Sequence, residues 1–329
     1  MSDIKLIGKE EAYKSISSQI DSGKLPHALM IVGDKGIGKK TFADAVCKRL
    51  FCESEADTCN SSCNACLKIE KGIHPDIFKI YPAGKSETIG VNEIAPIKKH
   101  LYIKPNDSAY KIFIIYNAER MNRFAQNAML KMIEEPPEDS FFIFTCKNAQ
   151  ALLPTVRSRV TVLRLAPARL EDVKAELVRR FPEKPQNELS RAAELSCGNI
   201  GLAIELCEDS EIEKLYDDAA NVAKAACDKD RALLCLYFGK YSKKKEMALR
   251  LVSLLKLIFR DISALKAGDD TSLSGCVDTV KSISAFLSGK SALAVMDACD
   301  AFVSAVEGNA NLALSLTALE IRIGQAVKR

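Results

Sequence analysis

Five short runs of apolar residues mark the first half of the chain, and stretches with helical spacing lie between them. The runs occupy residues 28–33, 76–82, 111–116, 141–146 and 160–165. They are rich in β-branched and aromatic residues with little polar alternation, which is typical of strands buried on both faces of a sheet. The alternation of strand and helix patterns therefore predicts an α/β domain built around a parallel sheet.

Helical periodicity dominates the second half. A helical stretch at 166–181 is followed by longer ones at 246–268 and 292–308, and both longer stretches end at a glycine. The expected fold class is therefore α/β plus all-α. We expect an α/β domain over residues 1–165, a small helical domain over 166–208 and a larger helical domain over 209–329.

Composition excludes several classes of protein. The 329 residues are 47% hydrophobic and 27% charged, which is ordinary for a globular chain with two or three cores. A net charge of +4 gives no strong case for nucleic-acid binding. The chain has no apolar run of the roughly 18 residues that a membrane span needs, and it starts with charged residues rather than a secretory signal. We expect a cytoplasmic protein with no membrane partner.

A glycine-rich loop follows the first apolar run and precedes a helical stretch that starts at Thr41. Its sequence GDKGIGKKT supplies Gly33, Gly36 and Gly38, whose backbone N–H groups can point at phosphate, and Lys39 adds a positive charge. The order of strand, loop and helix predicts a phosphate loop. The alternative is a glycine turn that caps a helix, and binding of ATP or ADP stays open.

The residues that would hold magnesium are missing. In a complete phosphate loop a Ser or Thr hydroxyl binds Mg²⁺ at the position of Lys40, and Thr41 comes one residue late, about 100° further around the helix. The run 111–116 would normally be followed by acidic groups, but Tyr116 and Asn117 stand there. We therefore expect no hydrolysis of ATP by this chain.

Four of the twelve cysteines are clustered. Cys52, Cys59, Cys63 and Cys66 lie within fifteen residues, which suits a structural tetrahedral Zn²⁺ site, and the alternatives are a redox pair or unrelated thiols. The other eight cysteines are predicted to be small buried hydrophobic residues: Cys47, Cys146, Cys197, Cys207, Cys227, Cys235, Cys276 and Cys299.

Several stretches together resemble the clamp-loader ATPases of bacterial replication, which belong to the AAA+ superfamily. The resemblance is carried by LPHALMIVGDKGIGKK (25–40), the cysteine quartet, HPDIFKIYP (74–82), VNEIAPI (91–97), NAMLKMIEEPP (127–137) and TVRSRV (155–160). It implies an AAA+ P-loop parallel sheet domain with a zinc module at 52–66, a small helical lid domain and a C-terminal helical collar domain.

The departures from this family imply a subunit that is not catalytic by itself. Gly201 in SCGNIGLAIEL stands where the motor subunits carry a further arginine, whereas Ser158 and Arg159 match the family's Ser-Arg pair. The resemblance implies that Arg159 acts in trans on a neighbour's nucleotide. The alternatives are a local ion pair of Arg159, or Arg157 in its place.

By the same resemblance, the partners are the gamma or tau motor subunits and delta, and through the complex the sliding clamp and primed DNA. Two competing interpretations stay open, an active ATPase motor and a standalone zinc-dependent nucleic-acid-binding module. The basic cluster KYSKKKEMALR (240–250) is expected to be a solvated face rather than a DNA contact. The helix at 127–137 is expected to pack through Ala128, Leu130, Met132 and Ile133.

Overall fold

The computed structural model of the chain describes residues 6–52, 63–84 and 87–327. The chain divides into two compact units. The first contains Met1–Asp172 and the short segment Asn199–Gly201, and the second contains Val173–Gly198 and Leu202–Arg329. Each unit has its own hydrophobic core and is described by itself.

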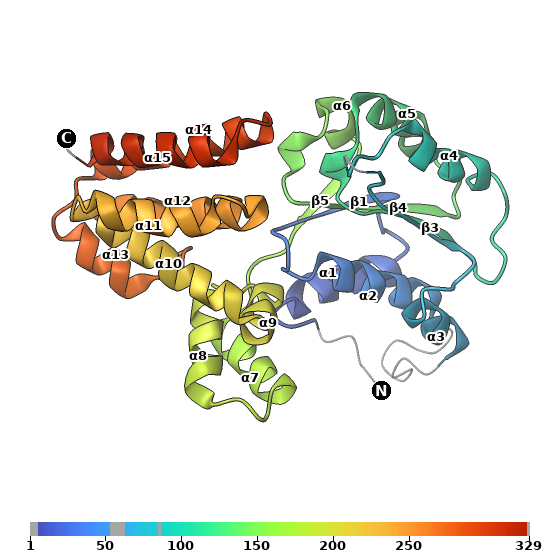
Figure 1. Cartoon of the computed structure of the whole chain (residues 1–329). Helices are drawn as coiled ribbons and strands as arrows, with labels where there is room; N and C mark the ends of the chain where they lie inside the picture. The colour runs from blue at the N-terminus through green and yellow to red at the C-terminus, as the bar shows by residue number, and fades with distance from the viewer. Residues whose placement is uncertain (1–5, 53–62, 85–86, 328–329) are drawn as a thin grey trace. The chain divides into compact units, whose positions relative to one another are not determined.

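The first unit is built around a five-stranded parallel sheet (Figure 1). Its strands, in the spatial order β2-β3-β4-β1-β5, are β2 (Ile77–Ile80), β3 (Lys111–Ile115), β4 (Ser140–Cys146), β1 (Ala28–Val32) and β5 (Thr161–Arg164). Every residue of β1, β3 and β4 is buried, which explains their uninterrupted apolar sequences, because helices cover both faces.

The two faces of the sheet carry separate cores, because side chains alternate along each strand. On one face Leu29, Ile31 and Ile114 pack against the first helices. These helices are α1 (Glu10–Asp21), α2 (Lys39–Phe51) and α3 (Asn64–Glu70). On the other face Met30 and Phe113 pack toward the remaining helices (Figure 1). They are α4 (Val91–His100), α5 (Arg123–Glu134) and α6 (Pro154–Arg157).

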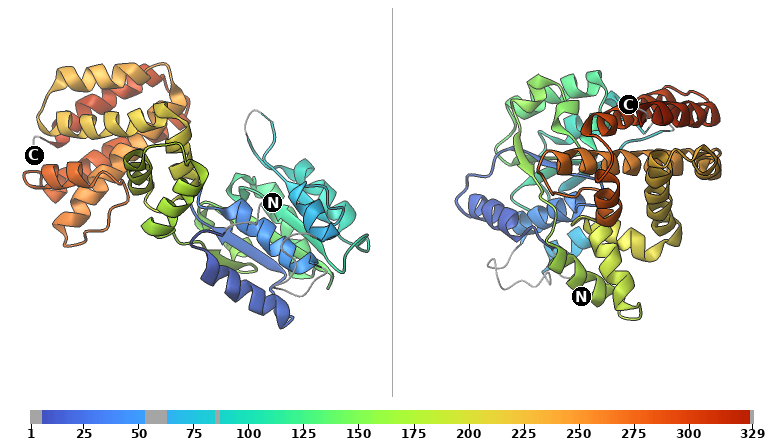
Figure 2. Two further views of the ribbon diagram at one scale, coloured as in Figure 1. Left: turned by 90° about the horizontal axis from the view of Figure 1, so that it is seen from below. Right: turned by 90° about the vertical axis from the view of Figure 1, so that its left-hand side faces the viewer.

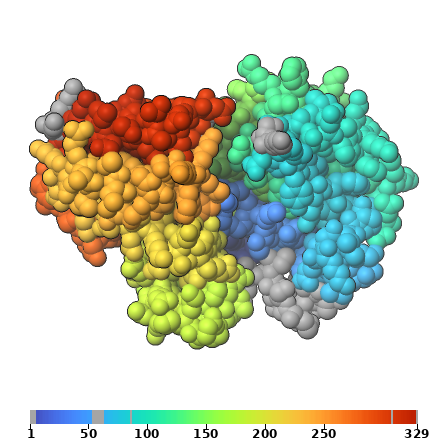
Figure 3. Space-filling model, viewed as in Figure 1, coloured from blue at the N-terminus to red at the C-terminus, as the bar shows by residue number. Residues whose placement is uncertain are grey.

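The second unit is helical (Figure 2). Its helices are α7 (Leu170–Arg180), α8 (Gln186–Leu195), α9 (Ile200–Glu208), α10 (Ser210–Cys227), α11 (Arg231–Tyr241), α12 (Lys245–Lys266), α13 (Val277–Ser284), α14 (Gly289–Glu307) and α15 (Leu312–Ala326). The long helix α12 packs against α10 and α14, and α14 packs against α15. This layering is visible in the space-filling view, where the red segments lie above the orange and yellow ones (Figure 3).

The predicted fold class is confirmed. All five apolar runs form strands of one parallel sheet, and helical structure follows the sheet unit. The helix after the glycine loop begins at Lys39 rather than at Thr41, because Gly38 takes a left-handed conformation with φ of 102° and caps it. The division at residues 165 and 208 stays a prediction.

No helix in the described part of the chain is long and apolar enough to cross a membrane. The packing of α5 differs in detail from the prediction. Met132 and Ile133 are buried as expected, but Ala125 and Met129 are the fully buried residues of this helix, whereas Ala128 and Leu130 are only partly covered.

Candidate nucleotide, metal and arginine sites

The predicted phosphate loop leads from the end of β1 to the start of α2. Lys39 folds back over it, and its Nζ donates hydrogen bonds to the carbonyl oxygens of Gly33 at 2.6 Å and Asp34 at 2.9 Å. Burial lowers the pKa of Lys39, while the charges of Glu119 and Asp34 act in the opposite direction. The lysine charge is therefore satisfied largely by the loop itself.

The segment Asn199–Gly201 packs directly on this loop within the first unit. The Asn199 Nδ2 donates to the Lys35 carbonyl at 2.8 Å, and the Gly201 N–H donates to the Gly36 carbonyl at 2.9 Å. A Cβ on Gly201 would lie 2.6 Å from the Gly36 Cα. Position 201, where the resemblance places an arginine in motor subunits, is thus a site of backbone contact with no room for a side chain.

Two tyrosines and a lysine lie in the region where a complete phosphate loop would place its magnesium ligands. The rings of Tyr81 and Tyr116 stack with centroids 4.8 Å apart, and the Lys40 Nζ lies 5.1 Å from each centroid. Burial raises the pKa of Tyr116 far above its ordinary value, so its phenol stays protonated. This arrangement offers cation–π contacts and no anionic oxygen for a metal ion. The part played by Tyr81 was not predicted.

An acid near the loop was also missed by the sequence reasoning. Glu119 lies in a short 3₁₀ turn, Ala118–Arg120, just after Asn117. Its charge acts on Lys39 and on Cys146, whose pKa burial raises to about 12. Its Oε2 is buried with no hydrogen-bond partner among the described residues. The signal available in the sequence was an acid within four residues of the end of β3.

Asn117, the polar residue that follows β3, is held by a hydrogen bond to β4. Asn117 has a φ of 52°, and its N–H donates to the Thr145 hydroxyl at 3.0 Å. Asparagine tolerates this left-handed conformation better than most residues. Asn117 therefore serves the local backbone geometry, and Thr145, which was not predicted, holds it.

Three of the four clustered cysteines come together. The sulfur atoms of Cys52, Cys63 and Cys66 all lie within 4.8 Å of one another, and Cys59 falls outside the described residues. Cys63 caps α3 by accepting a hydrogen bond from the Cys66 N–H at 3.5 Å. Thiolates around a zinc ion with Zn–S bonds of about 2.3 Å lie roughly 4 Å apart, so this donor set could hold a metal ion.

The scattered cysteines only partly match the prediction that they are buried. Five of them are buried, namely Cys47, Cys146, Cys207, Cys276 and Cys299. Cys197 and Cys227 are half-buried and Cys235 is exposed on α11, so the prediction is wrong for these three. Cys235 lies among apolar neighbours in sequence, but α11 is apolar on more than the face that packs inward.

Arg159 lies between α6 and β5, and its side chain is about 40% exposed. Its Nε lies 2.6 Å from the Glu134 Oε1, and its NH1 donates to the Thr155 carbonyl at 2.9 Å and to the Ser158 hydroxyl at 3.2 Å. The predicted alternative of a local ion pair is therefore present. Arg157 is more enclosed, and its Nε is buried with no hydrogen-bond partner within the described ranges of the chain.

The phosphate loop and Arg159 lie at opposite edges of the sheet. Leu29 of β1 pairs with Thr161 of the parallel strand β5. Gly33 follows Leu29 by four residues, and Arg159 precedes Thr161 by two. At about 3.3 Å per residue the two sites are roughly 20 Å apart along the strands. An arginine side chain cannot span this distance, so the structure does not bring these predicted site residues together.

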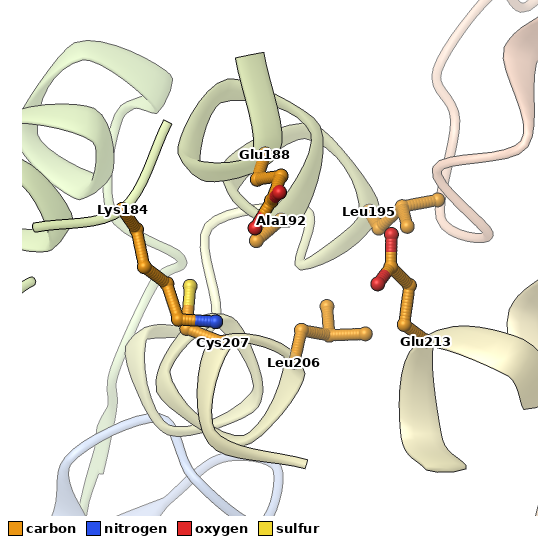
Figure 4. A pocket seen from close by; sticks show the side chains of 7 residues that line it. All are labelled: Lys184, Glu188, Ala192, Leu195, Leu206, Cys207 and Glu213. Atoms are coloured by element: carbon orange, nitrogen blue, oxygen red, sulfur yellow. The ribbon is translucent and has the colours of Figure 1, made fainter. Parts of the chain in front are cut away.

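The second unit shows no large polar site among its described residues. A small hollow between α8, α9 and α10 is lined by Lys184, Glu188, Cys207 and Glu213 among others (Figure 4). Its volume of about 20 Å³ is room for about one water molecule.

The basic cluster at 240–250 behaves as a solvated face. Lys240 pairs with Asp218 at 3.1 Å, Lys244 with Glu211 at 3.3 Å, and Arg250 with Glu205 at 2.7 Å. These local pairings use up much of the positive charge of the segment. They count against a DNA contact through this cluster.

Comparison with known proteins finds relatives among DNA polymerase III subunits. The profile of the family described as "DNA polymerase III, delta subunit" matches residues 8–169. The subunit gamma of Buchnera aphidicola subsp. Schizaphis graminum is 34% identical over 171 residues, which cover 51% of this chain and 46% of that protein. The subunit delta′ of Bacillus subtilis is 28% identical over 267 residues, 79% of this chain and 78% of that protein.

Solved structures include a similar chain. The crystal structure of a DNA polymerase III gamma subunit-related protein from Thermotoga maritima matches 96% of this chain and 99% of its own, with 18% identity and a TM-score of 0.46. The coverage of the sequence relatives differs, since the chain spans less than half of the Buchnera gamma subunit and over three quarters of the Bacillus delta′ subunit.

Proposed function

The chain belongs to the DNA polymerase III delta-prime subunit family, which is related to the gamma and tau clamp-loader subunits, and from this premise we propose its role. It is the stator of a clamp loader, an AAA+ subunit that does not hydrolyse ATP and lends an arginine to a neighbouring gamma or tau motor subunit. The assembly, which also contains delta, loads the sliding clamp onto primed DNA as part of the polymerase III holoenzyme.

The observation that carries this proposal is the chemistry around Lys40. Mg²⁺ takes oxygen ligands in octahedral geometry, usually one or two carboxylates together with the nucleotide's phosphates. Lys40, Tyr81 and Tyr116 instead form a packed group with a cation in it. A metal ion would meet repulsion here rather than ligands, which supports a chain that does not hydrolyse ATP itself.

The geometry of Arg159 supports action on a neighbour. The roughly 20 Å between Arg159 and its own phosphate loop rules out action in cis. The guanidinium is partly exposed, as a group that meets another subunit must be. An arginine supplied in trans stabilises charge on the transferring phosphoryl group and is worth about 10³–10⁵ in rate at that site.

The test is ATP turnover by the reconstituted assembly with clamp and primed DNA. We expect Arg159→Ala to lower the total by about the share that this one site contributes, because the other motor sites keep their own arginines. Arg157→Ala is the matched control and should leave turnover unchanged. Unchanged turnover with Arg159→Ala would remove the arginine from this role, and a loss only with Arg157→Ala would transfer the role to Arg157.

Glu119 favours a second candidate, an active motor. Its charge acts on Lys39, and its Oε2 has no hydrogen-bond partner among the described residues, so it is an acid near the loop that could serve in the way the missing acids would. An ATPase assay of the isolated chain with Mg²⁺ and primed DNA decides between the two. Turnover that Glu119→Gln abolishes would establish the motor, whereas a stator gives none.

We further propose that Cys59 completes the set of Cys52, Cys63 and Cys66 around a structural Zn²⁺ ion. Four thiolates leave no open position for water, so the ion would stabilise the segment rather than act in catalysis. Metal analysis should find one zinc per chain, and Cys63→Ser should lose it. Cys235→Ser, which changes an exposed cysteine outside the cluster, should keep it.

A further inference from the structure

We propose that Glu134 is the positioning residue of Arg159. The proposal rests on the proposed role of Arg159 and adds the group that orients it. Glu134 is the last residue of α5 and lies beside the loop that carries the arginine.

Three contacts restrain the guanidinium. Glu134 holds Nε at 2.6 Å, while Thr155 and Ser158 accept hydrogen bonds from NH1. The NH2 group has no hydrogen-bond partner in the part of the chain that the structure describes. A planar guanidinium held at both Nε and NH1 is restricted in orientation, and its NH2 donors stay available for an incoming anion.

The same helix also anchors the start of the arginine loop. Gln126 of α5 is buried, and its Nε2 donates to the Met121 carbonyl at 3.0 Å. Its Oε1 accepts a hydrogen bond from the N–H of Leu153, the residue that caps α6, at 2.7 Å. Helix α5 therefore holds α6 at its beginning through Gln126, and it holds the arginine that follows α6 through Glu134. Helices α5 and α6 lie side by side (Figure 1).

The position of Glu134 in its helix is otherwise unfavourable. A carboxylate at a helix C-terminus meets the negative end of the helix dipole. The helix has to end here because Glu135 leaves the helical conformation and Pro136 and Pro137 cannot continue it. The positive charge of Arg159 offsets this repulsion and so stabilises the Glu134 carboxylate at the end of the helix.

Burial shows that the pair is built for orientation rather than stability. The side chains of Arg159 and Glu134 are 39% and 41% exposed, and ion pairs this accessible to water contribute little to folding. Loss of the acid should therefore leave the fold and the assembly intact. Loss of Glu134 should instead lower the fraction of time in which the Arg159 guanidinium is oriented toward the neighbouring subunit.

The experiment compares Glu134→Ala, Glu134→Gln and Glu135→Ala in the reconstituted assembly with clamp and primed DNA. We expect Glu134→Ala to cause part of the loss of kcat that Arg159→Ala causes, with KM for ATP unchanged, because misplacement of a transition-state group affects the chemical step. Glu134→Gln keeps an oxygen acceptor for Nε and should restore most of kcat. Glu135→Ala removes the neighbouring exposed acid and should behave like the wild type.

A double variant separates failure of this proposal from failure of the proposed function. In the Arg159→Ala background, Glu134→Ala should have no further effect, because Glu134 acts through the arginine. An additional loss there, or a Glu134→Ala assembly as fast as or faster than the wild type, would overturn the role of Glu134. If Arg159→Ala itself has no effect, the proposed role of Arg159 is what fails.

Discussion

The two edges of the sheet use charge in opposite ways. At the carboxyl-terminal edge, Lys39 bonds to its own loop and Lys40 lies against two tyrosine rings, so both cations are occupied within the chain. At the amino-terminal edge, Arg159 is paired with Glu134 and its side chain is still about 40% exposed. One end of the strands thus pairs its cations within the chain, whereas the other leaves a guanidinium partly exposed.

The amino-terminal edge is also fixed by buried ionic groups. Asp76, just before β2, is fully buried and accepts backbone hydrogen bonds from residues 106–108. Lys111, the first residue of β3, donates to the carbonyls of His100, Ile103 and Lys104 at the end of α4. Buried charges with several partners make an edge rigid and are costly to disturb. The comparison therefore predicts larger losses of stability here than around the tyrosines.

The largest effect is expected for Asp76→Asn. An amide has one acceptor oxygen for three backbone N–H groups, and its own NH₂ would face donors. We expect a loss of about 3 kcal/mol in the free energy of unfolding, measured with urea. Asp107→Asn, a change in the neighbouring exposed pair with Lys68, is the control and should cost less than about 1 kcal/mol.

The same residue predicts a pH dependence. Burial alone would raise the pKa of Asp76, but the hydrogen bonds from Asn106, Asp107 and Ser108 outweigh it and hold the pKa below the ordinary value of 3.8. A carboxyl whose pKa is depressed by folding contributes stability above 3.8 and loses it as the pH falls through the folded value. Asp76→Asn should remove this part of the acid sensitivity. If Asp76→Asn leaves the acid sensitivity unchanged, the buried carboxylate does not stabilise the amino-terminal edge in the way proposed.

The sheet was readable from the sequence because burial leaves a simple trace. The runs at 111–116 and 141–146 are apolar throughout, and β3 and β4 are covered on both faces. The three cysteines were equally readable, since ligands close in sequence need little folding to meet. Local patterns of this kind carry their meaning within about fifteen residues.

The partners of the charged groups could not be read in the same way. Glu134 meets Arg159 from 25 residues away, and Gly201 meets Gly36 from more than 160 residues away. The polar pattern of α5 does not distinguish Glu134, which has a partner, from Glu135, for which the described structure shows none. Such pairings depend on how helices pack, and sequence spacing alone does not determine that.

A smaller loss is expected for Gly201→Ala. Its Cβ would lie 2.6 Å from the Gly36 Cα and 2.8 Å from the Gly36 carbonyl oxygen, and backbone atoms cannot rotate away. We expect about 2 kcal/mol of destabilisation, although alanine favours helix by itself. Gly239→Ala in α11 has no neighbour within 4 Å and should stabilise slightly. Equal effects of the two changes would show that the segment Asn199–Gly201 does not press on the loop in solution.

The smallest effect is expected for Lys40→Met, which keeps the length of the side chain and removes its charge. Lys40 is an exposed residue over two rings, so the loss in the free energy of unfolding should be about 0.5–1 kcal/mol. Lys35→Met, an exposed lysine of the same loop for which the described structure shows no ring contact, is the control and should be nearly neutral.

Lys40→Met also shows whether the tyrosine rings or the lysine charge occupy the region where magnesium ligands would lie. If the tyrosine stack of Tyr81 and Tyr116 is what occupies the edge, Lys40→Met leaves it in place and the chain stays without ATP turnover. If the positive charge of Lys40 is what excludes Mg²⁺, the variant should gain Mg²⁺-dependent nucleotide affinity. Titration calorimetry with and without Mg²⁺ would detect this gain. We expect no gain, because removing a positive charge supplies no oxygen ligand.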